Sequence, residues 1–366
     1  MRLLVAGGGT GGHLFPGIAV ANGIRRRRPE SRIMFVGTRR LLDQETLRKQ
    51  EFELESIDCT GLKGMSLLRR VGSVLQLVPA LWRAGSILGR FRPDLVLGVG
   101  GYVTGPVLLA ARLRGIPICI HEQNSVPGLA NRLLARIADR IFLSIPCRFS
   151  FSPRKTVMTG NPVREEILAA AAARSEEKKK ERTILVLGGS QGAHRVNLLM
   201  VEAAVRLAEK YDKTLTIIHQ SGRADEEEAR RGYEAAGIRA EVHGFIGDMA
   251  GVYGRADLVV SRAGATTLAE LAVMGLPALL IPYPYAADDH QRINALHYVE
   301  GGGARLLIER ELTGGALAGE IATLLDDPAL LAEMSAQMKK LGRPGATDAI
   351  IDECLNLLEE KGKPLH

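Results

Sequence analysis

Residues 2–13 read RLLVAGGGTGGH: a short apolar run enters a glycine-rich turn, and a helical stretch follows over 16–28. The same design returns at residues 183–193, TILVLGGSQGA, with a helical stretch over 194–210. A strand, a glycine turn and a helix form the start of a βαβ unit. Because the design occurs twice, the sequence predicts an α/β protein with two Rossmann-like, doubly wound domains.

The rest of the chain extends this pattern. Short apolar runs typical of buried parallel strands alternate with helical patterns, at 32–37, 95–99, 117–121, 214–219, 258–261 and 278–282. A charge-mixed segment over 169–182 follows an expected domain boundary near 161–164. We therefore predict an N-terminal domain over 1–163 and a C-terminal domain over 164–343. A last helix, 346–361 within the segment 344–366, could pack back on either domain, and our assignment gives it to the N-terminal one.

Composition limits the classes of protein that this chain can represent. It has 366 residues, 46% hydrophobic and 24% charged, which fits a two-domain globular protein. The four cysteines, Cys59, Cys119, Cys147 and Cys354, form no CxxC pair, so reduced thiols are expected rather than a zinc site or a disulfide framework. No signal peptide is expected, and no apolar run reaches the roughly 18 residues that a membrane span needs. These features predict a cytoplasmic protein, unless it binds a membrane from outside.

The formal net charge of +7 leaves several partners open, among them anionic lipid and a phosphorylated substrate. Aromatic residues make up only 4% of the chain, and none is interleaved with a basic stretch as a base-stacking surface requires. Nucleic acid is therefore not expected as a partner.

Gly7, Gly9 and Gly12 match the dinucleotide pattern GxGxxG, which by itself is a weak signal. A dinucleotide fold places an acidic residue at the end of its second strand, and here that strand ends Val36-Gly37-Thr38-Arg39. Arg39 and Arg40 could accept a 2′-phosphate, so an NADP enzyme remains an alternative on this evidence.

Polar residues beside the turns point toward phosphate and sugar chemistry. His13 follows the first turn and is a candidate for acid–base work. Ser190 and the backbone amides of the second turn suit a diphosphate. Residues 261–270, SRAGATTLAE, combine a strand end, a turn of small residues and a helix start, from which Glu270 could reach ribose hydroxyls. A carboxylate that merely stabilises the helix N-terminus is the alternative for Glu270.

Six motifs then occur in an order typical of one family: GGGTGGH (7–13), GVGGYVTGP (98–106), HEQNSVPGLANR (121–132), GNPVR (160–164), GGSQGA (188–193) and SRAGATTLAELAVMGLPALLIPYP (261–284). From Leu3 to about Arg305 the chain resembles the MurG family of peptidoglycan synthesis. This resemblance implies two Rossmann-like domains facing across a cleft, the GT-B arrangement. It also implies transfer of N-acetylglucosamine from UDP-GlcNAc to C4 of the muramyl residue in undecaprenyl-pyrophosphoryl-MurNAc-pentapeptide (lipid I), which gives lipid II and UDP.

The resemblance also implies residue roles. Thr10, Gly11 and Gly12 would lie beside the donor sugar and the acceptor diphosphate, and Asn124 would meet the donor sugar. The uridine diphosphate would contact Arg164, Ser190 and the backbone of Ile246. Gln291, which follows His290, would hold sugar hydroxyls. The phosphates and ribose would lie against Ala265, Thr266, Thr267, Leu268, Ala269 and Glu270.

The donor is α-linked and the family's product is β-linked, so one in-line displacement explains the inversion and needs a general base. His13 is the candidate base, and Glu122 is either its orienting partner or the base itself. The chain contains no Asp-x-Asp, the usual ligand pair for a metal that holds UDP. We therefore expect no obligatory metal and no cofactor, with helix N-termini and backbone amides stabilising the leaving group.

A lipid-linked acceptor requires contact with a membrane. Residues 62–92 carry an apolar stripe that includes the only tryptophan, Trp82. An apolar face with a basic rim predicts peripheral binding to an anionic surface at the cytoplasmic face of the cell membrane, and a core-facing stripe is the alternative. The rim consists of Lys63, Arg69, Arg70, Arg83, Arg90 and Arg92.

The resemblance further implies roles in cell-wall biogenesis, cell shape and cell division, with proteins of that machinery as partners. Two other readings stay open. One is another UDP-sugar enzyme of the same fold, an epimerase or a different glycosyltransferase. The other is a nucleotide-sugar-binding membrane scaffold without catalytic activity.

Overall fold

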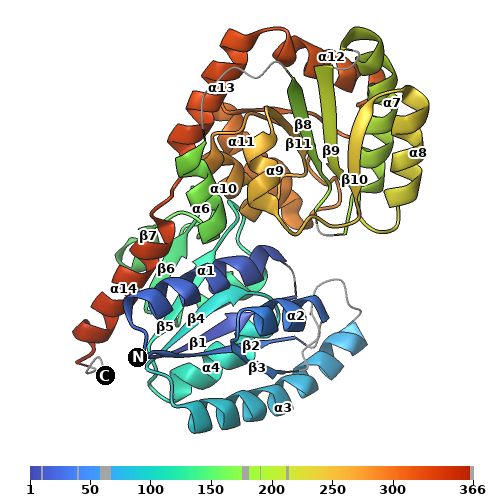
Figure 1. Ribbon diagram of the computed structural model, residues 1–366. Helices are drawn as coiled ribbons and strands as arrows, with labels where there is room; N and C mark the ends of the chain where they lie inside the picture. The colour runs from blue at the N-terminus through green and yellow to red at the C-terminus, as the bar shows by residue number, and fades with distance from the viewer. Residues whose placement is uncertain are drawn as a thin grey trace. The chain divides into compact units, whose positions relative to one another are not determined.

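The computed structural model describes residues 1–9, 11–38, 41–57, 67–174, 181–189, 191–211 and 214–362, without the side chains of 41–43 and 67–77. The chain divides into two compact units (Figure 1). Unit 1 consists of Met1–Arg164 and Gly345–His366, and unit 2 of Glu165–Pro344. The division falls one residue later than the expected boundary, which leaves Arg164 in unit 1.

Unit 1 is a parallel sheet of seven strands in the order β3-β2-β1-β4-β5-β6-β7, with helices on both faces (Figure 1). Its elements are β1 (Arg2–Gly7), α1 (Gly11–Arg27), β2 (Arg32–Gly37), α2 (Leu41–Lys49), β3 (Glu53–Ser56), α3 (Leu67–Phe91), β4 (Leu95–Gly100), α4 (Thr104–Leu113), β5 (Ile118–Glu122), α5 (Leu129–Leu134), β6 (Arg140–Leu143), the 3₁₀ turn η1 (Pro153–Lys155), β7 (Thr156–Met158) and the C-terminal helix α14 (Ala346–Glu360).

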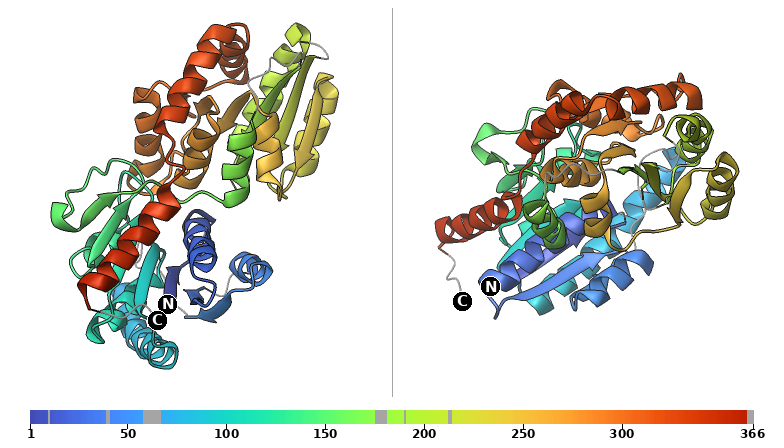
Figure 2. Two further views of the ribbon diagram at one scale, coloured as in Figure 1. Left: turned by 60° about the vertical axis from the view of Figure 1, so that its left-hand side comes forward. Right: turned by 45° about the horizontal axis from the view of Figure 1, so that its top comes forward.

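Successive side chains of β1 point to opposite faces of this sheet and show which helices cover each face. Leu3 and Val5 are buried in one cluster with residues of α1 and α14, such as Ile24 and Ile351. Leu4 and Ala6 point the other way, into a cluster with α3, α4 and α5. Because successive strand residues face opposite sides, an unbroken apolar strand requires helices on both faces. The views in Figure 2 show α14 beside α1.

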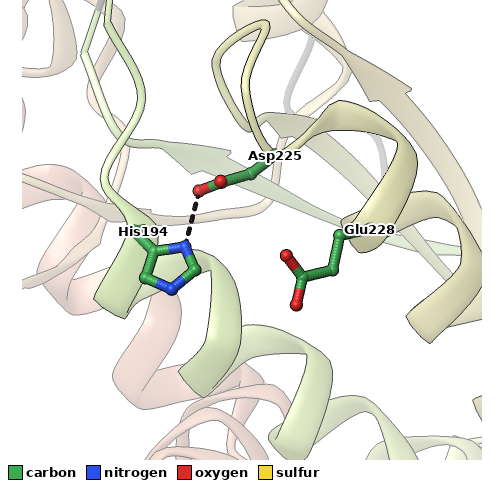
Figure 3. A group of neighbouring side chains, drawn as sticks. All are labelled: His194, Asp225 and Glu228. Carbon is green, nitrogen blue, oxygen red and sulfur yellow. Dashed lines mark hydrogen bonds and ion pairs between the residues drawn. The ribbon is translucent and has the colours of Figure 1, made fainter.

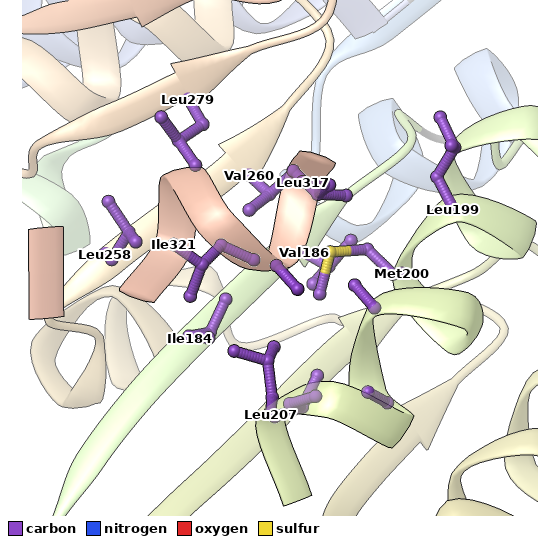
Figure 4. Packing of buried hydrophobic residues seen from close by; sticks show 14 of the residues in the cluster. Ile184, Val186, Leu199, Met200, Leu207, Leu258, Val260, Leu279, Leu317 and Ile321 are labelled. Carbon is purple, nitrogen blue, oxygen red and sulfur yellow. The ribbon is translucent and has the colours of Figure 1, made fainter. Parts of the chain in front are cut away.

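Unit 2 is a parallel sheet of six strands in the order β10-β9-β8-β11-β12-β13. On one face α7, α8, α12 and α13 bury a single cluster; Ile184, Val260 and Ile321 lie within it (Figure 4). Its elements are α6 (Glu165–Ala173), β8 (Arg182–Leu187), α7 (His194–Tyr211), β9 (Leu215–Gln220), α8 (Glu226–Ala236), β10 (Arg239–His243), α9 (Met249–Arg255), β11 (Leu258–Ser261), α10 (Ala265–Met274), β12 (Ala278–Leu280), the 3₁₀ turn η3 (Ala287–Asp289), α11 (His290–Glu300), β13 (Ala304–Leu306), α12 (Gly314–Leu325) and α13 (Pro328–Leu341).

The predicted fold class is confirmed, because each unit has the 3-2-1-4-5-6 strand order of a Rossmann-like sheet. The predicted strands agree with the observed ones to within one or two residues. Helix α1 is the clear exception, since it begins at Gly11 rather than at residue 16. Although proline favours the first helical turn, Pro16 lies inside this helix.

In both sheets the order of strands reverses beside the first strand, between β1 and β4 in unit 1 and between β8 and β11 in unit 2. Open α/β sheets bind their ligands at the carboxyl ends of the strands on either side of such a reversal. Both glycine turns of the sequence lie at these points. Of the helices in the described part of the chain, none has the length and apolar character needed to cross a bilayer.

Candidate active site

In unit 1 two glycine turns, one after β1 and one after β4, touch at the point of strand reversal. A Cβ atom on Gly7 would lie 2.4 Å from Cγ2 of Val99, and one on Gly101 would lie 2.7 Å from the carbonyl oxygen of Gly8. Gly8 and Gly101 also have φ angles of 137° and 95°, which favour glycine. The close contact of backbones explains why both turns are rich in glycine.

His13 lies in the first turn of α1, and Gly100 provides the space for its ring. A Cβ atom on Gly100 would lie 2.7 Å from Nδ1 of His13. The imidazole is half-buried, at the end of the sheet where ligands bind in this fold. Gly11 and Gly12 are the first two residues of α1, and Thr10 lies outside the described residues.

A second histidine, His121 at the end of β5, is fully buried near His13. Gln123 donates from its amide to Nδ1 of His121 over 3.1 Å, and Nε2 of His121 lies 3.2 Å from the carbonyl oxygen of Gly160. Burial is the main cause that lowers the pKa of His121 to about 4, and the nearby His13 lowers it further. His121 is therefore neutral at pH 7 and places an uncharged ring near the candidate base.

Glu122, the alternative base, organises the loop that follows it. One oxygen of its carboxylate accepts from the backbone N–H of Asn124 over 3.0 Å and from the side-chain amide of Asn124 over 3.2 Å. The other accepts from the N–H of Gly128 over 3.2 Å and from the Asn131 amide over 2.8 Å. The side chain is 2% exposed. Since both oxygens already accept hydrogen bonds, the geometry favours a positioning role for Glu122, and Asn124 is the residue that it positions.

Arg164 ends unit 1 and lies against α1. Its guanidinium carbon lies 4.8 Å from the centre of the Phe15 ring, within the range of a cation–π contact. Phe15 is two residues from His13 on the same helix. Helix α1 therefore carries His13 and also provides the ring against which Arg164 lies.

In unit 2 the turn after β8 rests on the end of β9. Gln220 donates from Nε2 to the carbonyl oxygen of Gly189 over 2.9 Å, and its Oε1 accepts from the N–H of Ile246 over 2.9 Å. The N–H of Ile246 is thus engaged, which leaves the carbonyl as the group that this residue can offer to a base. Ser190 lies outside the described residues.

Helix α10 begins at Ala265, directly after Gly264, so the first N–H groups of the helix belong to Ala265, Thr266 and Thr267. These amides and the helix dipole favour an anion at this end. Ala269, farther along the first turns, is buried. Leu268 is fully buried, and its N–H donates to the carbonyl oxygen of Gly264 over 3.0 Å, so its side chain packs in the core.

Glu270 lies in the second turn of α10 and is only 4% exposed. The Tyr253 hydroxyl of α9 donates to its Oε2 over 2.9 Å. This bond fixes the carboxylate from one side. The other candidate for sugar contact, Gln291, is likewise fixed, because its Oε1 accepts from the N–H of Tyr283 over 2.9 Å.

The segment before Gln291 is strained. Asp288 and Asp289 have φ angles of 55° and 53°, and His290 bonds through Nδ1 to the carbonyl of Ala287 over 2.8 Å. Non-glycine residues in the left-handed region cluster at functional sites, where surrounding structure holds them. This strain supports a functional role for the segment that presents Gln291.

One group in the described part of the chain could hold a metal ion: His194, Asp225 and Glu228, whose ligand atoms lie within 4.8 Å of one another (Figure 3). His194 bonds to Asp225 over 3.0 Å, and both His194 and Glu228 are exposed. Exposed groups of this kind are common without a metal. The expectation of no obligatory metal stays a prediction.

The predicted membrane segment falls partly on α3. Residues 62–66 lie outside the described residues, and the side chains of 67–77 are not described. Farther along α3, Ala84 and Leu88 are buried, whereas Val78 and Trp82 are 68% and 77% exposed. Leu113 of the neighbouring α4 is 71% exposed. The described part of α3 therefore has a core face and a separate apolar outer face, the latter formed by Val78 and Trp82.

The basic rim predicted for this segment is partly engaged within the protein. Arg90 pairs with Glu55 over 2.8 Å, and Arg83 lies 3.9 Å from the same carboxylate. Arg114 lies beside the outer face, since a Cβ atom on Gly85 would lie 3.2 Å from its guanidinium.

Gln220 and Tyr253 belong to the candidate site but were not identified from the sequence. Gln220 had a signal, because it is a polar residue at the end of a buried apolar strand. Tyr253 had none, since only the packing of α9 brings its hydroxyl to Glu270.

Comparison with known proteins adds to this geometry. Residues 3–143 match the glycosyltransferase family 28 N-terminal domain, and residues 183–350 match the C-terminal domain of that family. The UDP-N-acetylglucosamine–N-acetylmuramyl-(pentapeptide) pyrophosphoryl-undecaprenol N-acetylglucosamine transferase of Geotalea daltonii is 49% identical over 355 residues, with 96% of this chain and 97% of that protein covered. The transferase of the same name from Geobacter sp. (strain M21) is 46% identical over 364 residues, with 99% and 98% covered.

Solved structures give the same picture at the level of the fold. The crystal structure of Acinetobacter baumannii MurG matches with a TM-score of 0.79 and 32% identity, over 98% of this chain and 99% of that one. A UDP-N-acetylglucosamine 2-epimerase matches with a TM-score of 0.68 over 100% and 98%. At 16% identity, the epimerase shares the fold alone.

Proposed function

The chain belongs to glycosyltransferase family 28 and, within it, to the MurG transferases, and from this premise we propose that it transfers N-acetylglucosamine from UDP-GlcNAc to the C4 hydroxyl of the muramyl residue in lipid I, giving lipid II and UDP. Similarity along nearly the whole chain to UDP-N-acetylglucosamine–N-acetylmuramyl-(pentapeptide) pyrophosphoryl-undecaprenol N-acetylglucosamine transferases carries this proposal. Unit 1 would bind the lipid-linked acceptor and unit 2 the donor.

The reaction is a single displacement at the anomeric carbon. The acceptor O4 forms the bond to C1 of N-acetylglucosamine, and the bond from C1 to the phosphate oxygen breaks, its electron pair leaving with UDP. The acceptor proton passes to the His13 imidazole, which is the general base. Support for this assignment is the position of His13 at the strand reversal, together with the four donors already bonded to Glu122.

Unit 2 would stabilise the leaving group without a metal. The amides at the start of α10 and those of the turn after β8 would favour the diphosphate, and Ser190 and Thr266 would add polar contacts. Arg164, at the end of unit 1, would add a positive charge. Glu270 would accept from the ribose hydroxyls, and the carbonyl of Ile246 from the uracil N3–H. Asn124 and Gln291 would hold the donor sugar.

An assay with labelled UDP-GlcNAc and a short-chain lipid I analogue tests the proposal. The expected product is a disaccharide-linked lipid, formed with EDTA present as well as without it. An epimerase would convert UDP-GlcNAc without an acceptor, and a non-catalytic scaffold would bind the donor and form no product. The NADP alternative rests on Arg39 and Arg40, which lie outside the described residues, and it predicts binding of NADPH in the same preparation.

The acceptor lies in a membrane, and the outer face of α3 suits peripheral attachment to an anionic surface at the cytoplasmic side. The exposed Val78 and Trp82, the nearby Arg114 and the exposed Leu113 of α4 support this attachment. Proteins of the cell-wall and division machinery are further proposed partners.

A further inference from the structure

Gln220 occupies the middle of three strand ends in unit 2. In the register of the sheet it pairs with Leu187, the last residue of β8, and with His243, the last residue of β10. From this position its side chain reaches both neighbours: it donates to the carbonyl of Gly189 in the turn after β8 and accepts from the N–H of Ile246 in the loop after β10, each over 2.9 Å. The side chain is 5% exposed, so both bonds form in a largely desolvated place.

Backbone packing at the same place makes the connection stiff. A Cβ atom on Gly192 would lie 2.1 Å from the carbonyl oxygen of Ser221, and one on Gly222 would lie 2.6 Å from that of Gln191. The turn after β8 therefore rests directly on the segment that follows Gln220. The amide of Asn197 holds this segment from the α7 side by donating to the Ser221 carbonyl over 2.8 Å.

We propose that Gln220 is a positioning and specificity-determining residue for the nucleotide, which sets the diphosphate-binding turn and the base-binding backbone of Ile246 at one fixed separation. This inference rests on the proposed function. Because the N–H of Ile246 already donates to Gln220, Ile246 can offer only an acceptor, its carbonyl oxygen, to the edge of the nucleotide base. An acceptor suits the N3–H of uracil and repels the N3 lone pair of cytosine. Release of the N–H would provide a donor for cytosine and weaken the discrimination.

Two substitutions separate the two bonds. Gln220→Met removes both and leaves the Gly189 carbonyl and the Ile246 N–H without a partner. Gln220→Glu keeps an acceptor for Ile246, but an ionised carboxylate cannot donate to Gly189, whereas a protonated one can. The matched control is Gln337→Met on α13, where the glutamine makes one long contact to Lys340 over 3.4 Å.

The experiment measures binding of UDP and of CDP to each full-length protein by calorimetry, together with donor KM and kcat. Loss of buried hydrogen bonds predicts that Gln220→Met binds UDP about 10- to 100-fold more weakly, with kcat within about threefold of the wild type. Its preference for UDP over CDP should fall at least about fivefold. In Gln220→Glu the UDP affinity should recover as the pH is lowered from 8 to 6, relative to the wild type.

Unchanged UDP affinity and unchanged UDP-to-CDP preference in both variants would overturn the inference. A loss of thermal stability without any change in preference would overturn it as well, because a structural role alone moves both nucleotides equally. If Gln220→Met does not fold, the pH dependence of Gln220→Glu decides. Wild-type protein that binds no UDP would instead contradict the proposed function.

Discussion

Among single residues, His13 is the general base that we propose, and its replacement has the largest expected effect on the chemical step. Replacement by alanine should lower kcat by about 10² to 10⁴, because a general base contributes a factor of that size. The donor KM should change little, and the acidic limb of the pH–rate profile should disappear. Steady-state kinetics with a soluble acceptor analogue measures these effects. An intact kcat with a raised acceptor KM would make His13 a diphosphate contact instead and would return the base to Glu122.

Glu270 and Tyr253 form a buried pair whose two members should differ in their effect on the donor. Glu270→Ala removes a charged acceptor from the ribose, at about 1.5–3 kcal/mol for each bond, so donor KM should rise at least about tenfold. Tyr253→Phe removes only the bond that orients Glu270, and a rise of about three- to tenfold is expected. Kinetics with UDP-GlcNAc and its 2′-deoxy analogue tests this order. Equal and full affinity in both variants would remove Glu270 from the ribose site.

Among the helices, α3 is the one that we propose contacts the membrane, through its outer face. The variant Val78→Ser/Trp82→Ser should detach from vesicles containing phosphatidylglycerol, because it removes exposed apolar area that contributes about 25 cal/mol per Å² when buried. Activity on a soluble acceptor analogue should persist. Vesicle sedimentation provides the measurement, and Val205→Ser on α7, which replaces another exposed valine, is the control. Equal binding of the double variant and the control would argue against this face.

Helix α14 is held to the rest of unit 1 by apolar contacts and by exposed ion pairs. The apolar contacts should contribute more to the free energy of unfolding than the ion pairs. Leu357 is fully buried, so Leu357→Ala should cost about 2–5 kcal/mol of unfolding free energy. Asp352 pairs with Arg27 over 2.5 Å, yet its side chain is 59% exposed, and Asp352→Asn should cost less than about 1 kcal/mol. Urea unfolding of the Leu357→Ala and Asp352→Asn variants compares the two losses of unfolding free energy. The reverse order would mean that ion pairs hold the C-terminal helix.

Among the described residues, each unit has one histidine that is buried and neutral at pH 7, His121 in unit 1 and His219 in unit 2, and both should make stability depend on pH. Burial lowers the pKa of His121 to about 4 and that of His219 to about 3. The unfolded chain binds protons at these sites near pH 6.5, so stability is full above that value. It is lost as the pH falls toward the folded-state pKa, by on the order of 3 kcal/mol per histidine.

Urea unfolding between pH 7 and pH 4 measures this loss. His121→Asn should flatten the slope, and His243→Gln, which replaces an exposed histidine, should leave it unchanged. A slope that is the same in all three proteins would show that carboxylates account for it.

Local pattern was enough to predict the central strands of both sheets, whereas the strands nearer the edges, β3, β6, β7, β10 and β13, were not predicted. The strand, glycine turn and helix at residues 2–28 and at 183–210 involve near neighbours in the chain, and the motifs around His13 and Glu270 lie within single turns. The sequence therefore predicted the fold class and most candidate residues. The pairings within the site were decided by tertiary structure: the donors that fill Glu122, the Tyr253 hydroxyl on Glu270, the Gln220 amide between two loops and the return of α14 to unit 1. These contacts form because the strands do not lie in sequence order in the sheet or because a distant helix packs back. Periodicity along the chain carries no information about such contacts.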